Sequence, residues 1–410
     1  MTDPARGLGA GRYTEAIPEP DAVTTSVHQL RTFDGANVVG VLRRPAGART
    51  VVTLMHPRQD VTHHALVPLL LGSGLAVWTQ GSRSPNNDLN LLHEQAILDF
   101  AAGQVFLREW GFESVVALGH SGGGTLAAFY IQQASLPPGL RLTHTPSGRP
   151  VPLGEAVMPL PSGFVALAPH PGQGALLQRV IDPSVVDEGD PLSRDPGLDP
   201  FNPANGFVDA PGPTRFSPDF VAAYRAGQRA RVARIDAIAA EMNAARRGAD
   251  ASFRDGGSAM DRRAAIAPAL VTVYRTDADL RNVDLTLDQN LRPYGSLFGR
   301  RPDLTNYGLV GFGRLSTAEA WMSTWSASTT NAGFLRCAAS IEVPTLLLEF
   351  AGDQASFPTD IERFAAAIPA ADLTVEAVDG THFGDRLTKG APTGNELAAV
   401  RIDSWVGERF

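Results

Sequence analysis

Short apolar runs alternate with longer stretches of helical spacing over most of the chain. Runs of strand length occupy residues 27–33, 38–42, 51–55, 75–79, 114–118, 164–168, 345–350 and 373–378. Helix-forming stretches occupy residues 65–71, 89–110, 125–130, 361–367 and 396–405. The first two apolar runs flank Asp34-Gly35, which is typical of a hairpin turn. A hairpin followed by alternating strands and helices predicts an α/β protein with a mostly parallel sheet covered on both faces.

This alternation stops between residues 171 and 340. The first part of the interval is rich in proline and aspartate, which predicts irregular chain across the surface. Ser217-Pro218-Asp219 then predicts the start of a helix that runs to about Arg247, because it supplies an N-cap and a proline at the first helical position. The predicted division is an N-terminal arm (1–25), a core (26–170 and 341–410) and a largely helical cap or lid inserted into it (171–340).

The composition predicts a globular protein of the cytoplasm. The chain has 410 residues, of which 43% are hydrophobic and 19% charged, and no apolar stretch long enough to span a bilayer is expected. A net charge of −8 disfavours nucleic acid and anionic membranes as partners. Cys337 is the single cysteine, which excludes an internal disulfide. The partner expected is therefore a small-molecule substrate, with assembly into a homo-oligomer left open.

Gly119-His120-Ser121-Gly122-Gly123 is the stretch most informative about chemistry. It follows the apolar run 114–118 and leads into a helix-forming stretch, which is the layout of a nucleophile elbow. The helix start would offer backbone N–H groups and a positive dipole end near the serine oxygen. Alone the pattern is weak evidence, because glycine makes up a tenth of the chain.

With two later turns, the chain resembles the α/β-hydrolase superfamily. Gly352-Asp353 follows the run 345–350, and Asp379-Gly380-Thr381-His382 follows the run 373–378. In that family the triad runs serine, acid, histidine along the chain, with the acid and the histidine after late strands. The resemblance covers about residues 26–170 and 340–410. It implies Ser121 as nucleophile, His382 as general base and Asp353 as the acid that orients the imidazole.

The identity of the acid leaves alternatives. Asp353 is expected, and the nearby rivals are Glu349, Asp379 and Asp385. Glu349 lies within a predicted strand and Asp379 is close to His382 in sequence, so both have less favourable reach.

Acyl transfer also needs donors aimed at the developing oxyanion. The resemblance implies the backbone N–H of Gly122 as one donor and an N–H from the loop after residues 51–55 as the other. That loop reads His56-Pro57-Arg58-Gln59, and Pro57 has no N–H to give. The second donor is expected to be Arg58, with Gln59 as the alternative. The Arg58 side chain either reaches a substrate carboxylate or forms a surface ion pair.

Three further residues are candidates for substrate binding. His170 follows the strand at 164–168 and either lines the pocket or belongs to a loop. Trp321 and Trp325 are four residues apart on a predicted helix, so they form either a pocket wall or part of the cap core. His120 is expected to pack structurally. No metal site or cofactor is implied, since His63 and His64 are adjacent and would diverge on a helix.

The chain is therefore expected to be a serine hydrolase that cleaves a carboxylic ester or lactone through an acyl-enzyme. The substrate expected is small to medium in size and partly hydrophobic. An acyltransferase, or a hydrolase of C–C, thioester or amide bonds, would use the same triad. A non-catalytic ligand-binding protein of this fold is the remaining alternative, and such proteins usually lack a triad member.

Overall fold

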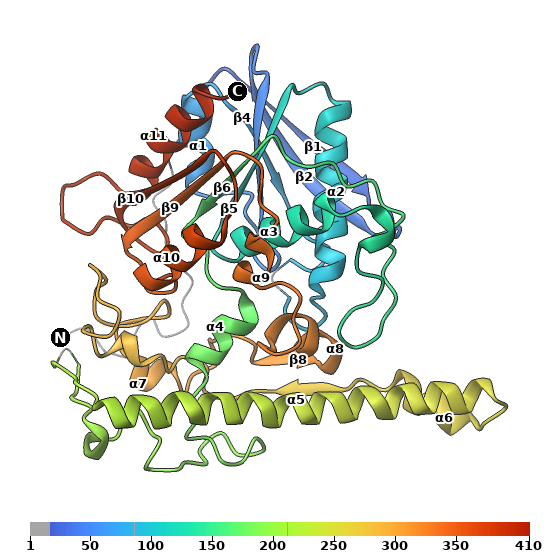
Figure 1. The fold of residues 1–410 in the computed structure, drawn as a ribbon, viewed down its shortest axis with the longest axis vertical. Coiled ribbons are helices and arrows are strands. Elements are labelled where there is room, and N and C mark those ends of the chain that lie inside the picture. Colours follow the sequence, from blue (N-terminus) through green and yellow to red (C-terminus); the bar gives the residue numbers. More distant parts are fainter. Residues whose placement is uncertain (1–16, 86, 211) are drawn as a thin grey trace.

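The computed structural model describes residues 17–85, 87–210 and 212–410. Its main sheet has eight strands in the order β1-β2-β4-β3-β5-β6-β9-β10 (Figure 1). β2 runs antiparallel to its neighbours β1 and β4, and the strands from β4 to β10 pair in parallel. The strands are β1 (Val23–Arg31), β2 (Asn37–Pro45), β3 (Thr50–Met55), β4 (Ala76–Gln80), β5 (Ser114–His120), β6 (Gly163–Leu167), β9 (Thr345–Gly352) and β10 (Leu373–Thr381). The predicted, mostly parallel sheet is confirmed.

Helices cover both faces of this sheet. One face carries α1 (Leu66–Gly72) and α11 (Gly394–Gly407), and the other carries α2 (His93–Glu109), α3 (Gly122–Ser135) and α10 (Pro358–Ala367). The central strands are apolar without alternation because both of their faces are buried: every residue of β3 and β6 is buried.

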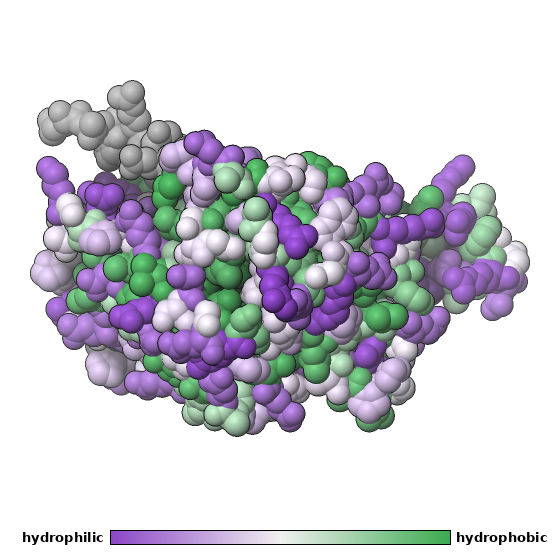
Figure 2. Space-filling view, turned by 90° about the horizontal axis from the view of Figure 1, so that it is seen from above, coloured by the Kyte–Doolittle hydropathy of each residue, from purple (hydrophilic) through white to green (hydrophobic). Residues whose placement is uncertain are grey.

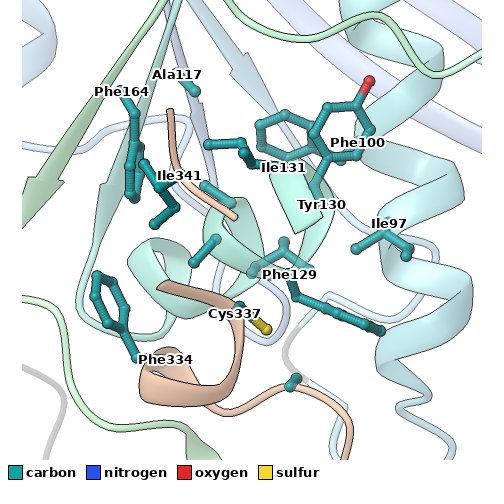
Figure 3. Packing of buried hydrophobic residues seen from close by; sticks show 14 of the residues in the cluster. Ile97, Phe100, Ala117, Phe129, Tyr130, Ile131, Phe164, Phe334, Cys337 and Ile341 are labelled. Atoms are coloured by element: carbon teal, nitrogen blue, oxygen red, sulfur yellow. The ribbon is translucent and has the colours of Figure 1, made fainter. Parts of the chain in front are cut away.

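The second face holds the larger apolar cluster. In Figure 3 side chains from α2, α3, β6 and α9 (Phe334–Ala338) point toward one another, and the rings of Phe100 and Tyr130 lie 4.6 Å apart. This packing fixes α3, whose first residue follows the elbow serine. The position of the site therefore depends on a helix that is buried along most of its length.

The edge strand β1 begins earlier than the hydrophobic pattern predicts. It starts at Val23, which pairs with Pro45 of β2, so the strand extends into the predicted arm 1–25. The pattern missed these residues because this half-exposed edge strand carries threonines in place of large apolar side chains. Residues 1–16 of the predicted arm lie outside the described residues.

The inserted segment lies below the sheet in Figure 1. Its helix α5 runs from Pro218 to Arg254, past the predicted end near Arg247, and its N-cap Ser217 accepts a hydrogen bond from the Phe220 N–H as predicted. Together with α6, the far end of α5 projects beyond the rest of the molecule, and its surface mixes hydrophilic and hydrophobic residues (Figures 1 and 2). The other elements here are α4 (Gln173–Val180), α6 (Ala259–Ile266), α7 (Pro302–Thr305), α8 (Ala318–Ala320), the two-stranded sheet of β7 (Leu270–Thr272) and β8 (Leu315–Thr317), and the π-helical turn η4 (Trp321–Trp325). Short 3-10 turns of the insertion occupy Pro203–Asn205 and Leu280–Asn282, and another lies before β6 at Pro138–Leu140.

The return from the insertion to the core packs with the core. Phe334 and Cys337 of α9 are fully buried in the cluster that contains α3, although they lie within the predicted cap of residues 171–340. The boundary at residue 340 stays a prediction. Within the described ranges, no helix is both long and apolar enough to cross a membrane.

Candidate active site

Ser121 lies in the sharp turn between β5 and α3. Its backbone has φ 57° and ψ −120°, a conformation that residues other than glycine rarely adopt. The flanking glycines are required for space: a Cβ on Gly119 would lie 2.4 Å from backbone atoms of Gly123, and one on Gly123 would lie 2.6 Å from the Met55 carbonyl oxygen. The turn has the strained geometry of a nucleophile elbow, and it directs the Ser121 hydroxyl toward His382.

The three predicted triad residues meet in one chain of hydrogen bonds. His382 Nδ1 lies 2.9 Å from both carboxylate oxygens of Asp353, and His382 Nε2 lies 2.8 Å from Ser121 Oγ. Asp353 and His382 are each 1% exposed. Because the carboxylate can only accept, Nδ1 carries the proton and Nε2 presents a lone pair to the serine hydroxyl. This is the protonation pattern that a general base requires.

Backbone donors fix the Asp353 carboxylate. Its Oδ1 accepts the N–H groups of Ala355 (2.6 Å) and Ser356 (2.9 Å), just before α10. Among the rivals, Asp379 is exposed on β10, and burial raises the pKa of Glu349. His382 thus takes its carboxylate partner from the turn after β9.

His64 and His120 hold the loop that carries His382. The N–H of Leu66 donates to His64 Nδ1 (3.2 Å), His64 Nε2 lies 2.9 Å from His120 Nδ1, and His120 Nε2 donates to the His382 carbonyl (2.7 Å). Burial lowers the pKa of His64 to about 4 and that of His120 well below its usual value, so both rings are neutral. The structural role predicted for His120 is what the geometry shows. His64 was missed, because nothing local in the sequence indicates its contact with His120.

The loop after β3 differs from the prediction for the oxyanion donors. Gly122 is the first residue of α3, so its N–H has no partner within the helix, and its role as an oxyanion donor stays a prediction. The N–H of Arg58 instead donates to the side chain of His56, at 3.0 Å from Nδ1, and the N–H of Gln59 donates to the same atom at 2.9 Å. Both loop donors proposed for the oxyanion are therefore used inside the loop. Arg58 as second donor is corrected, since a side-chain acceptor two residues earlier captures its N–H.

The Arg58 side chain forms the ion pair that was one of its two expected roles. Its Nε and an Nη donate to the two oxygens of Asp88 at 2.5 and 2.6 Å. Its guanidinium also lies 4.7 Å from the ring centre of Trp325. Arg58 thereby joins the β3 loop to the insertion.

A cavity of about 560 Å³ opens beside Ser121 and His382. His170 lines it, as one of the two expectations had it, together with His56. The opposite wall comes from the inserted segment and was not predicted, because residues 293–312 have no regular pattern of apolar positions. Its apolar members are Leu297, Phe298, Val310 and Phe312.

Trp321 and Trp325 do not form the pocket wall. Both are fully buried in an apolar cluster with residues of α4 and α5, and neither lines the cavity. The four-residue spacing is compatible with either role, and here η4 turns both rings into the packed interior of the insertion. In the described part of the chain, no three His, Cys, Asp or Glu side chains are grouped as ligands for a metal ion.

Strand order and elbow together define the class: the chain has the α/β-hydrolase fold, with a largely helical insertion between β6 and β9. No family model matches the chain, and no curated protein matches it significantly.

Several solved structures resemble the chain at a distance. Hypothetical protein PA2218 from Pseudomonas aeruginosa is 12% identical over 97% of this chain and 99% of that chain, with a TM-score of 0.48. Est1E from Butyrivibrio proteoclasticus is 10% identical over 93% and 98%, with a TM-score of 0.45. Brefeldin A esterase, a bacterial homologue of human hormone-sensitive lipase, is 13% identical over 98% and 81%, with a TM-score of 0.43. Resemblances this distant assign no activity, and the fold is established by the strand order and connections of the chain itself.

Proposed function

We propose that this protein is a serine hydrolase that cleaves a carboxylic ester or lactone through an acyl-enzyme on Ser121. The observation that supports this most directly is the unbroken series of contacts from the Asp353 carboxylate through His382 to Ser121 Oγ, at 2.9 and 2.8 Å. It ends at the wall of a cavity large enough for a small-molecule substrate.

In the first half of the reaction, Ser121 Oγ attacks the carbonyl carbon while its proton moves to His382 Nε2. The Oγ–C bond forms and the carbonyl electrons move onto oxygen, giving a tetrahedral intermediate. His382 then gives the proton to the departing alkoxide, and the C–O bond to the alcohol breaks. Asp353 keeps Nδ1 protonated throughout and stabilises the imidazolium.

In the second half, water takes the place of the alcohol. His382 Nε2 accepts a proton from water, and the hydroxide oxygen attacks the acyl carbon of the ester on Ser121. The second tetrahedral intermediate collapses when Nε2 returns the proton to Ser121 Oγ, which releases the carboxylic acid. No cofactor takes part in this scheme.

The cavity favours a substrate that is partly hydrophobic. Its lining combines apolar side chains of the insertion (Leu297, Phe298, Val310 and Phe312) with polar groups that include Ser121, His382, His56 and His170. A volume of about 560 Å³ suits a small to medium acyl or alcohol group.

The direct test is hydrolysis of a short-chain p-nitrophenyl ester by wild type, Ser121→Ala and Ser135→Ala. The control, Ser135, is an exposed serine at the end of α3. Ser121→Ala is expected to lose at least about a thousandfold in kcat, because the nucleophile is gone, while Ser135→Ala keeps wild-type rates. Equal rates in wild type and Ser121→Ala would refute the proposal.

The substrate class needs a second experiment. A fluorophosphonate probe should label wild type at Ser121 and leave Ser121→Ala unlabelled. Esters, lactones, thioesters and amides are then compared as competitors of labelling, and alcohol or amine acceptors are added to detect acyl transfer. The best competitor identifies the kind of bond that the enzyme cleaves. An acylated alcohol or amine among the products would show that the acyl group passes to that acceptor rather than to water.

A further inference from the structure

Side-chain nitrogen atoms border Gly122, the residue that follows the candidate nucleophile. An ideal Cβ on Gly122 would lie 2.8 Å from His56 Nε2, 2.9 Å from His170 Nε2 and 2.6 Å from Gln173 Nε2. His56 comes from the loop after β3 and His170 from the loop after β6, so they approach the elbow from both neighbouring strands. Both histidines also line the cavity that contains Ser121. Polar side chains from the loops after both neighbouring strands thus converge beside Gly122.

The proton on the His56 ring is placed by its own loop. Its Nδ1 accepts the N–H groups of Arg58 (3.0 Å) and Gln59 (2.9 Å), and an atom that accepts two donors carries no proton. In the neutral ring the proton is therefore on Nε2, the atom beside Gly122. The same two contacts remove both backbone donors that the loop could have offered to an oxyanion.

His170 is arranged in the same way from the other side. Its Nδ1 accepts the N–H of Gly172 at 2.9 Å, and its backbone carbonyl accepts the hydroxyl of Thr125, on α3, at 2.7 Å. The ring therefore also presents Nε2–H toward Gly122. His56 is 5% exposed and His170 is 3% exposed.

Both rings remain neutral donors at ordinary pH. Burial, and then the charge of Arg58, hold the pKa of His56 well below its usual value. Burial is the main reason that the pKa of His170 is lowered to about 3, and repulsion from His382 in its protonated form adds to the effect. Neutral imidazoles give hydrogen bonds to a developing negative charge without releasing a proton that would compete with His382.

The third nitrogen adds an independent observation. Gln173 is 1% exposed, and its Nε2 is a buried donor with no hydrogen-bond partner among the described residues. Its Oε1 lies 3.1 Å from His93 Nε2, which directs the amide nitrogen toward Gly122. The Gln173 side-chain amide is thus a third polar group that an atom entering beside Gly122 would meet.

We propose that the side chains of His56 and His170 are oxyanion donors, so that two imidazole Nε2–H groups and the Gly122 N–H bind the carbonyl oxygen when Ser121 attacks. When the Ser121 Oγ–C bond forms, the carbonyl π electrons move onto this oxygen, and both imidazoles keep their protons. This inference rests on the proposed serine hydrolase function. It gives side chains the role of the oxyanion donor expected from the loop after β3. The backbone there does not fill that role, because Pro57 has no N–H and the N–H of Arg58 already donates to His56.

Asparagine in place of His56 or His170 removes the proposed Nε2–H donor and keeps an acceptor for the backbone N–H groups that bind Nδ1. An asparagine Oδ1 takes the place of histidine Nδ1 and still accepts the loop N–H groups, while the Nε2–H is removed. His56→Asn and His170→Asn are each expected to lower kcat for a p-nitrophenyl ester roughly 100- to 1000-fold with KM little changed, as loss of one oxyanion donor does. Glutamine places an amide N–H near Nε2, so His56→Gln and His170→Gln are expected to recover part of the rate. His63→Asn is the matched control, since His63 is exposed.

The second readout is the inhibition constant of an alkyl trifluoromethyl ketone, whose adduct with a serine carries an oxyanion. It should rise in parallel with the loss of kcat in the asparagine variants, while circular dichroism and thermal unfolding stay close to wild type. If an asparagine variant keeps kcat and ketone affinity within about threefold of wild type, that histidine is not an oxyanion donor. Ser121→Ala in the same assay keeps the two hypotheses apart: its inactivity alongside active histidine variants would overturn this inference alone, and its activity would overturn the proposed function.

Discussion

Replacing Asp353 with asparagine should abolish most activity by placing the histidine proton on the wrong nitrogen. Asp353 Oδ1 accepts two backbone N–H groups, from Ala355 and Ser356, while both oxygens face His382 Nδ1 at 2.9 Å. In Asp353→Asn the amide oxygen must stay on the two backbone donors. Turning the amide around would leave both buried N–H groups unpaired, at a cost of about 2–6 kcal/mol.

The amide NH₂ would then donate to His382 Nδ1, which must accept it and so lose its proton. The proton moves to Nε2, where it faces Ser121 Oγ at 2.8 Å and prevents the ring from acting as a base. A triad with this tautomer loses about 10⁴-fold in kcat, which corresponds to about 5 kcal/mol of transition-state stabilisation.

The assay is ester hydrolysis at pH 7, with thermal unfolding as a check that the fold is intact. Asp379→Asn is the matched control, because Asp379 is exposed two residues before the end of β10 and should keep its rate within about twofold. If Asp353→Asn retains more than about a tenth of wild-type kcat, the tautomer argument and the assignment of the acid are both wrong.

Three other variants test separate features. Gly122→Ala places a methyl group 2.6–2.9 Å from three buried side-chain nitrogens, so kcat should fall about 100-fold and the free energy of unfolding by about 1–3 kcal/mol. Gly139→Ala, whose Cβ meets nothing within 4 Å, should stay active and stable. Ser121→Gly should exceed Ser121→Ala in unfolding free energy by about 1 kcal/mol, because φ is 57°; the usual order, alanine above glycine, would contradict the strain. His93 has its pKa lowered to about 4 by burial, so the unfolded state binds more protons below pH 7 and this residue should cost about 2 kcal/mol of stability between pH 7 and pH 5. In urea unfolding, the free energy of unfolding of His93→Gln should fall by about 2 kcal/mol less than that of wild type between pH 7 and pH 5. An equal fall in the two proteins would show that the pKa of His93 is not lowered in the folded state.

The contacts among Ser121, His382 and Asp353 were predictable because the signals for these residues are local. Glycines around Ser121 mark a turn that needs them, and Asp353 and His382 each follow an apolar run that forms a parallel strand. Parallel strands end at the same edge of a sheet, so residues far apart in sequence meet there. The apolar pattern located all eight strands of the main sheet, although β1 starts earlier, at Val23, than the pattern predicts.

The proposed oxyanion donors and the lining of the cavity depend on contacts that the spacing of residues in the sequence does not encode. The N–H of Arg58 is unavailable to a substrate because the buried His56 ring accepts it, and the sequence does not show how that ring is oriented. Trp321 and Trp325 have the same spacing in a packed core as in a pocket wall, and the π-helical turn selects the core. The apolar side chains at residues 297–312 that line the cavity come from mostly irregular chain, which has no regular spacing of apolar positions.

The insertion between β6 and β9 is also a single crossover connection of about 180 residues. These two strands are parallel neighbours, so the chain must return from one end of the sheet to the other before they can pair. Closing a loop of this length costs about 2 kcal/mol more than closing a crossover of about a dozen residues. We therefore expect the pairing of β6 with β9, a contact of high sequence separation, to form late in folding and to complete the half of the sheet that carries Asp353 and His382. On this expectation, the strands that carry Ser121 and those that carry Asp353 and His382 are joined last.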